Sequence, residues 1–592
     1  MSRKIGKAFV LILAGILVFG ALAGCAPTQT SPSTTGSSKA DVTTAGTTGE
    51  TTAGTTAGTT EGTTETESSS TTSDEIPLSE MDPITFEMFK PWSGEEIPAD
   101  DSVISSMVYD KTKVRVNFTL PPAEADEKLN IMLVSQEFPD IIEFPDVISM
   151  QKFIDAGVLI PLDSLVREQA PNLLANLGPI YDQLKQEDGN IYHIPMWFRA
   201  LGKEEFPESW DCIFSRTGVL EDMGWFSPKT LDDFTTVLKK VRDEYDMIPI
   251  MVPLADPGYS PAGVIKGASG LAGTSDIYLD ENNKVAWLYK SPQARQFISW
   301  MNMLYREGLL NEESITMRSE MIETKLNAGE LYSAIGVASS LSQIFEEKGI
   351  KEALWNTYLK LDDSVEKMTY CSYSVYYPTG YGVTTSCSDP ERFFKFVNFM
   401  NSEEGYLTSH GPVNMDGDTN ADGFNHYLID GAIIPTESLR KAMEEDEDYW
   451  LKQGLWFWNQ FHSDTSNPAT TTIDFLKMEE DVGNWWNDTE REVFPKLGMK
   501  GTDYWPNQRS MGVDVSEITE LPLDPDSDEN IIKIDVDDYF RKQLPKMVIA
   551  ATEADFNELF DEFIQTSTDL GIDQYIAKME ELHQERLALW NQ

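Results

Sequence analysis

Basic residues are scarce in this chain of 592 residues, in which 46 Lys and Arg stand against 98 Asp and Glu and the net charge is −52. Binding to nucleic acid needs a basic surface that neutralises phosphate, so the composition argues against a nucleic-acid partner. Histidine occurs only five times, and His410, His426 and His462 lie in unrelated stretches. We therefore expect no histidine metal site.

Cysteine, long apolar runs and phosphate loops are also rare or missing. The four cysteines are widely spaced, and an odd number remains without Cys25, so neither a disulfide framework nor zinc-ligand spacing emerges. No apolar run beyond the N-terminal segment approaches the ~20 residues of a membrane-spanning helix, which predicts a soluble body. No Gly-x-x-x-x-Gly-Lys-Ser/Thr loop occurs, so we expect no ATP hydrolysis by this chain.

The first segment that is present is typical of export. Residues 1–24 combine basic residues at positions 3, 4 and 7 with an apolar run and small residues before a cut site, as in a secretory signal. The segment LAGC at 22–25 resembles the bacterial lipobox, in which the cysteine becomes a lipid-carrying N-terminus. The alternative is a chance cysteine after an ordinary signal. We expect 1–24 to be a lipoprotein signal peptide and Cys25 to hold the protein at the extracellular face of the cell membrane.

Residues 25–79 should form a tether behind that anchor. The stretch 28–75 is mostly Thr, Gly and Ser and contains no leucine, isoleucine or aromatic residue. It cannot bury enough apolar surface to offset its ordering entropy. A flexible chain of this length has an end-to-end reach of about 40 Å, enough to hold a globular body clear of a membrane.

The rest of the chain alternates strand and helix patterns. Residues 84–89 and 114–120 alternate apolar and polar side chains, as half-buried strands do, and 138–144 is a third short apolar run. Helical spacing of apolar residues marks 231–245 and 292–308, and it recurs after Thr552 near the C-terminus. The pattern predicts an α/β fold of at least two lobes with largely parallel sheets, whose ligands lie at the carboxyl ends of strands.

Six phrases resemble, in order, the extracellular solute-binding proteins of bacterial ABC importers, closest to the large carbohydrate-binding lipoproteins of the family 1-like type. They are FPDIIEF (138–144), AGVLIPLDSLV (156–166), DGNIYHIPMW (188–197), SPQARQFISWMNMLYREGLLNEES (291–314), LNAGELYSAIG (326–336) and PERFFKFVNFMNSEEG (390–405).

The resemblance implies a two-lobed periplasmic-binding-protein-like fold, with a hinge and an interlobe ligand cleft. The first lobe is expected to take 80–195 and 371–410, and the second 196–370 and 411–592. Closure of the hinge would capture the ligand. The lipid would keep a monomeric receptor beside the permease subunits of its importer.

Candidate ligand residues follow from sugar chemistry. A sugar ring presents C–H groups on its face and hydroxyls at its rim, so a site needs aromatic plates with Asp, Glu or Arg nearby. Each Trp could equally be a core residue, and Asp140 could instead cap the turn after Pro139. The candidates are Trp92, Asp140, Glu143, Trp197, Arg199, Trp210, Asp211, Tyr259, Tyr377 and Trp456.

One segment resembles the start of a calcium loop. Asp418, Asn420 and Asp422 alternate before Gly423, as oxygen ligands do in such loops. The acidic residue expected at the twelfth position is replaced by Ile429. We favour a solvated, turn-rich loop over a structural calcium ion, which would brace the loop if it bound. No other cofactor is expected.

These observations predict a carbohydrate receptor without catalysis, whose ligand is an oligosaccharide. One alternative is a receptor for peptides or another cationic solute, which an acidic cleft would attract. Another is a glycoside hydrolase, which needs two carboxylates about 5–10 Å apart across a sugar cleft. The order of the phrases favours the receptor.

Overall fold

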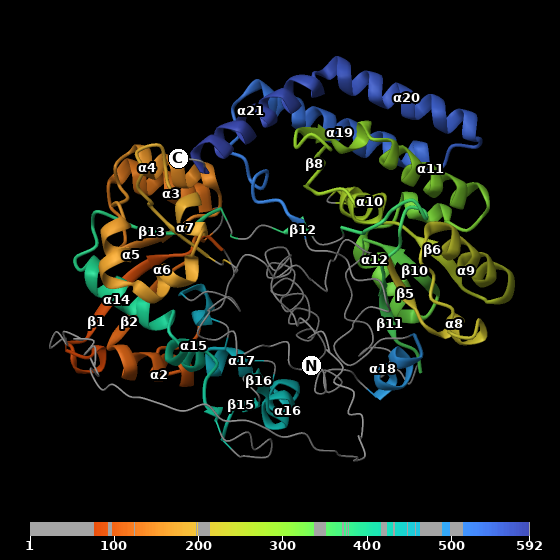
Figure 1. Cartoon of the computed structure of the whole chain (residues 1–592). Helices are drawn as coiled ribbons and strands as arrows, with labels where there is room; N and C mark the ends of the chain where they lie inside the picture. Colours follow the sequence, from red (N-terminus) through yellow and green to blue (C-terminus); the bar gives the residue numbers. More distant parts are fainter. Residues whose placement is uncertain are drawn as a thin grey trace, which may run out of the picture.

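The computed structural model describes residues 76–590, apart from 93–96, 123–124, 197, 199–212, 258, 337–350, 370–371, 374–375, 377, 416–422, 430–431, 447, 456, 462–487 and 498–512. Each of two lobes contains a mixed sheet with helices packed on it (Figure 1). The fold is therefore the two-lobed α/β fold that the sequence predicts. In the part of the chain with assigned structure, no helix combines the length and the apolar character needed to cross a membrane.

The first lobe is built on a five-stranded sheet of order β2-β1-β3-β13-β4. β1 runs parallel to β2 and β3, whereas β13 runs antiparallel to β3 and β4. The strands are β1 (Ile84–Phe89), β2 (Val114–Thr119), β3 (Ile141–Glu143), β4 (Ile194–Pro195) and β13 (Gly380–Val383). The helices are α2 (Val103–Thr112), α3 (Ala125–Ser135), α4 (Val147–Asp155), α5 (Asp163–Gln169), α6 (Pro171–Leu177), α7 (Ile180–Gln183), α14 (Pro390–Met400) and α15 (Glu403–Ser409).

The second lobe is built on a four-stranded sheet of order β11-β5-β10-β6, in which only β10 and β6 are parallel. The strands are β5 (Ile213–Arg216), β6 (Ile248–Met251), β10 (Leu331–Ile335) and β11 (Leu354–Thr357). A small sheet of β7 (Gly273–Thr274), β8 (Ile277–Leu279) and β9 (Val285–Trp287) belongs to the same lobe and packs in its core. The helices are α8 (Gly218–Asp222), α9 (Leu231–Glu244), α10 (Ala262–Ser269), α11 (Pro292–Arg306), α12 (Ser319–Ala328), α19 (Asp528–Val548), α20 (Glu553–Leu570) and α21 (Ile572–Trp590).

The expectation of largely parallel sheets was wrong. The antiparallel pairs involve β5 and β13. β5 is the first strand that the chain forms after it leaves the first lobe, and β13 is the first strand that it forms in the first-lobe sheet after it returns from the second. A strand that arrives in this way is not the product of a strand–helix–strand crossover, which imposes parallel pairing. The sequence pattern predicts the strands, but it does not show where the chain passes from one lobe to the other.

The predicted helices are confirmed, and their starts are set by capping. Thr230 and Asp233 form a capping box at the start of α9, and Thr552 and Asp555 form another at the start of α20. The inward face of α20 then buries Phe556, Phe560 and Phe563. The predicted helix at 292–308 is α11, which ends at Arg306.

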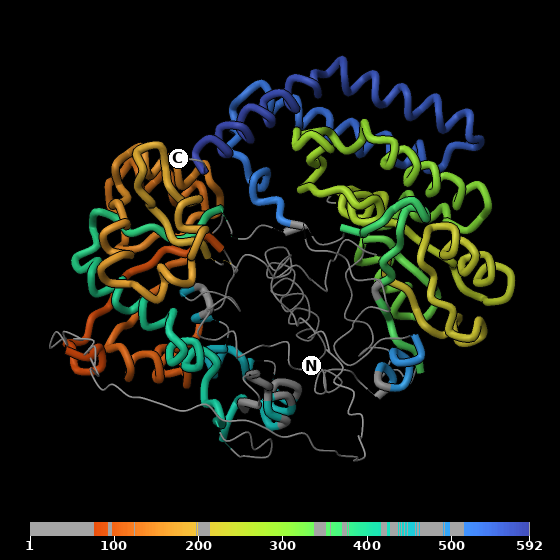
Figure 2. Tube along the Cα trace, viewed as in Figure 1, coloured from red at the N-terminus to blue at the C-terminus, as the bar shows by residue number. Residues whose placement is uncertain are grey.

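Two large cores divide the chain, and they depart from the expected lobe ranges, since Phe198 and part of 411–592 pack in the first core. We expected 411–592 to lie in the second lobe, but Leu439, Leu455, Trp458 and Phe461 pack in the core of the first. The Phe461 ring lies 5.3 Å from that of Phe396 on α14. These apolar side chains belong to α16 (Glu437–Glu445), to η4 (Phe457–Phe461) and to the turn after α17 (Tyr449–Gln453). Figure 2 shows this middle part of the chain beside the N-terminal part.

Candidate functional site

The first candidate half-site lies at the carboxyl edge of the first-lobe sheet. β1 and β3 are parallel neighbours in the register Phe89↔Ile142, so both strands end at the same edge. Lys90 and Trp92 follow β1 directly, and Glu143 is the last residue of β3. Parallel sheets bind ligands at this edge.

Glu143 orients the Trp92 ring. The indole Nε1 of Trp92 donates a hydrogen bond of 2.9 Å to Oε1 of Glu143, and Nζ of Lys90 lies 3.8 Å from Oε2. The Glu143 side chain is 1% exposed, so its charge needs this compensation. Trp92 itself is only partly buried. The site therefore presents a partly exposed indole whose plane is held by a buried ion pair.

Lys90 is the residue that the sequence interpretation missed. Its ammonium lies 5.7 Å from the centroid of the Phe457 ring, and that ring packs edge-on against Phe118. A signal was present, because Phe86, Met88, Lys90 and Trp92 occupy alternate positions and side chains alternate between faces in extended backbone. A lysine that continues a buried face predicts a buried partner of opposite charge.

Asp140 has a different position from Glu143. Its Oδ2 accepts a 2.8 Å hydrogen bond from the backbone N–H of Glu87, and its carbonyl accepts one of 2.9 Å from Thr384. It therefore links the segment before β3 to β1 and to the residue after β13. In the structure this carboxylate holds strands together.

The second candidate half-site lies in the second lobe. β6 and β10 are parallel neighbours that end at one edge, and the loop after β6 carries Tyr259. The Tyr259 ring packs on Gly336, which follows β10 with φ of +65°, so closely that a Cβ there would lie 2.9 Å from the ring. A cavity of about 280 Å³ is lined by Leu254, Ala255, Asp256, Pro257, Tyr259, Asp538, Phe540, Arg541, Lys542 and Leu544.

The remaining candidates lie outside the described residues. They are Cys25, Trp197, Arg199, Trp210, Asp211, Tyr377, Trp456 and the three calcium-loop residues Asp418, Asn420 and Asp422. Two of their neighbours are described: Phe198 and Tyr376 pair across an isolated bridge and are buried in the first-lobe core.

His410 and His426 are in contact, so placing them in unrelated settings was wrong. Their ring centroids lie 5.6 Å apart, and both side chains are buried. The Nδ1 atoms lie 2.8 Å and 2.9 Å from the carbonyls of Tyr406 and His410, respectively. β15 (His426–Ile429) pairs with β14 (Val413–Asn414) just after α15, which brings His426 back to His410. Within the described ranges, no three His, Cys, Asp or Glu side chains are grouped to hold a metal ion.

Comparisons with known proteins agree with this architecture. Residues 97–406 match the bacterial extracellular solute-binding protein family. Lipoprotein LipO of Bacillus subtilis (strain 168) is 23% identical over 384 residues, or 61% of this chain and 71% of LipO. An HMO-binding, ABC-transporter-associated solute-binding protein from Bifidobacterium longum infantis superposes with a TM-score of 0.57 at 14% identity, over 85% of this chain and 98% of that one.

A second solved structure is the EF-hand mutant of S. pneumoniae FusA, an ABC-transporter substrate-binding protein, in complex with fructo-nystose. It superposes with a TM-score of 0.55 at 15% identity, over 85% of this chain and 100% of FusA. At such identities the two structures show a shared fold. The family match spans more than half of the 592 residues, and this chain therefore belongs to the bacterial extracellular solute-binding proteins.

Proposed function

We propose that this protein is the substrate-binding component of an ABC importer and that it captures an oligosaccharide without catalysis. The observation that carries the proposal is Trp92, whose partly exposed indole is held by the buried Glu143 at the carboxyl edge of the sheet. An indole face packs on the C–H face of a sugar ring, and the buried Glu143–Lys90 pair keeps that face in position.

The family relatives support this ligand class. One superposed protein is HMO-binding, and FusA is in complex with fructo-nystose. The second lobe supplies Tyr259 at an equivalent edge of its own sheet, beside a cavity. A ligand that touches both edges would bias the lobes toward closure.

Location and assembly follow from the N-terminal segments. Removal of residues 1–24 would leave lipidated Cys25 and the tether 25–79, which would keep a monomeric receptor near its permease subunits. The homologue LipO is itself a lipoprotein, which supports the anchor. For Asp418, Asn420 and Asp422 we keep the preference for a solvated loop, with a structural calcium ion as the alternative.

The proposal is tested by calorimetric titration of the full chain, in detergent, with plant and microbial oligosaccharides. Saturable binding to one glycan series, with no cleavage products afterwards, is the expected result. Cleavage products would identify a hydrolase. Binding only to peptides or polyamines in the same titration would replace the carbohydrate class with a cationic one.

Glu143 should act on affinity through Trp92. We expect Glu143→Gln to weaken glycan binding about tenfold, or about 1.4 kcal/mol, because the amide leaves Lys90 without its charge partner and the indole less firmly held. The measurement is titration of the variant beside a Lys90→Met/Glu143→Gln double variant. The double variant should regain stability, since no buried charge remains, but not affinity. Equal affinity in all three proteins would contradict this role.

A further inference from the structure

One path between the lobes can be followed in the described residues. Met368 packs in the core of the second lobe, and Tyr376 is buried in the core of the first. Between them, β12 (Ser372–Tyr373) pairs in parallel with β17 (Val513–Asp514). Beyond β17, Val515 and Ile518 return to the second-lobe core. This crossover is therefore a two-stranded ribbon.

α21 is a second connection between the lobes. Its start, with Ile572 and Tyr575, is buried in the second-lobe core. The last residue of the helix, Trp590, packs against the first-lobe core, and its side chain lies near that of Tyr376. α21 also contacts α7 of the first lobe. Figure 1 shows the helix reaching from one lobe to the other.

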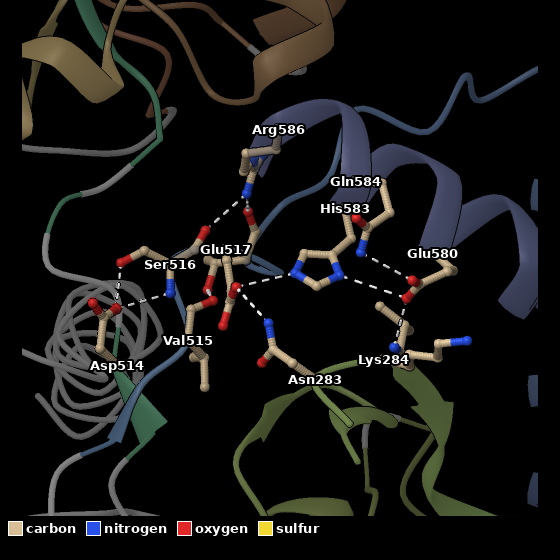
Figure 3. A network of polar contacts seen from close by, with 12 residues as sticks. Asn283, Lys284, Asp514, Val515, Ser516, Glu517, Glu580, His583, Gln584 and Arg586 are labelled. Atoms are coloured by element: carbon tan, nitrogen blue, oxygen red, sulfur yellow. Dashed lines mark hydrogen bonds and ion pairs between the residues drawn. The ribbon is translucent and has the colours of Figure 1, made fainter. Parts of the chain in front are cut away.

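Arg586, one turn before Trp590, hydrogen-bonds to the segment that follows β17. Its guanidinium donates to the carbonyl of Ser516 at 2.9 Å (Figure 3). It also donates to the carbonyls of Thr519 and Glu520, at 2.5 and 3.0 Å. Glu520 has φ of +47°, a conformation that non-glycine residues seldom adopt. Three carbonyl acceptors around one planar fork match arginine and not lysine.

The middle of α21 contacts the same segment after β17. Nε2 of His583, a fully buried side chain, lies 3.1 Å from Oε2 of Glu517, which also accepts from Asn283 at 3.2 Å (Figure 3). Glu580 accepts the backbone N–H of Val285 at 2.8 Å. α21, the segment after β17 and the β8–β9 hairpin are therefore tied together in the second lobe.

We propose that the last turns of α21, through Arg586 and Trp590, form a pivot that limits how freely the lobes turn and so tunes ligand affinity from outside the site. This inference rests on the proposed function. Trp590 lies near Tyr376, the point where the crossover enters the first-lobe core, and points near a hinge axis move least. The contact should therefore persist when the lobes close. It should also reduce the number of relative lobe orientations in the free protein, and so the entropy that ligand binding must remove.

The test measures lobe orientation and affinity in the full chain. Nitroxide labels at Val134 on α3 and Met321 on α12, both exposed, are introduced through unnatural amino acids, which leave the cysteines unchanged. Trp590→Ala should broaden the distance distribution between the labels and weaken glycan binding about fivefold, at the low end of coupling between sites. Trp590→Phe should rescue most of both effects. Glu585→Ala, on the exposed face of the same helix, should change neither.

Each other outcome is decisive. An unchanged distance distribution in Trp590→Ala would overturn the pivot. Tighter glycan binding by that variant would also overturn it, since the contact would then oppose lobe closure. If that variant does not fold, Arg586→Lys decides the question, because it keeps the charge but lacks the fork, and the pivot requires it to broaden the distribution. If the parent protein binds no glycan, the proposed function fails, while the label distances still test the pivot.

Discussion

We expect Trp92→Ala to weaken glycan binding about 100-fold, equivalent to about 2.7 kcal/mol, with little change in the free energy of unfolding. The indole is partly exposed, and its plane is fixed by the 2.9 Å hydrogen bond to Glu143. A ring that is already oriented loses little entropy when a sugar stacks on it, so its removal should be felt in the affinity. Calorimetric titration of the variant beside the parent protein measures this directly.

The chain offers a matched control for the Trp92 prediction. Trp300 on α11 also donates its indole N–H, to Oγ1 of Thr235 at 2.9 Å, but it is 6% exposed within the second-lobe core. Trp300→Phe should lower stability and leave glycan affinity unchanged, whereas Trp92→Phe should retain part of the stacking and lose the N–H. An affinity of Trp92→Ala within twofold of the parent would remove Trp92 from the site.

Acid should destabilise this protein through its buried histidines. Burial lowers the pKa of His193 from 6.5 to about 4 and that of His426 to about 3. Burial also lowers the pKa of His410, which lies against His426. The unfolded chain takes up these protons near pH 6.5, before the folded chain can. The stability is therefore fully present above pH 6.5 and is lost as the pH falls toward the folded pKa values.

The expected loss between pH 7.5 and pH 5 is about 2 kcal/mol for each of His193 and His426, at about 1.4 kcal/mol per pH unit. Urea unfolding at the two pH values measures it. In His193→Leu the difference between the two pH values should shrink by about 2 kcal/mol, whatever the variant's own stability. A pH dependence identical to that of the parent would show that His193 is not held neutral.

Local patterns predicted the elements whose signals are local. α9 and α20 are each marked by a threonine cap with Asp three residues later and by apolar residues at helical spacing. β1 alternates Phe86 and Met88 with polar neighbours on a half-buried sheet. In these cases the same residues set the local geometry and face the core, so one stretch of sequence contains the whole signal.

Features that depend on distant partners were missed. η4 (Phe457–Phe461) joins the first-lobe core through ring contacts with α14, some sixty positions earlier in the chain. The sequence of η4 alone does not indicate which lobe it packs against. Lys90 was overlooked because a lysine is normally exposed, and only the proximity of Glu143 shows why it is buried. Tyr259 was selected from the Gly and Pro around it, but its packing on Gly336 needed the parallel pairing of β6 and β10.

The strand order of the first lobe has a consequence for biosynthesis. β13 lies between β3 and β4, although 184 residues lie between Pro195, where β4 ends, and Gly380, where β13 begins. Until β13 has been synthesised, β3 and β4 therefore lack their common partner, although the sheet of the second lobe precedes β13 in the chain. Unpaired edges of this kind associate readily with other chains. A chain that ends before Gly380 would thus lack the strand that joins β3 to β4, and its first-lobe sheet would stay incomplete.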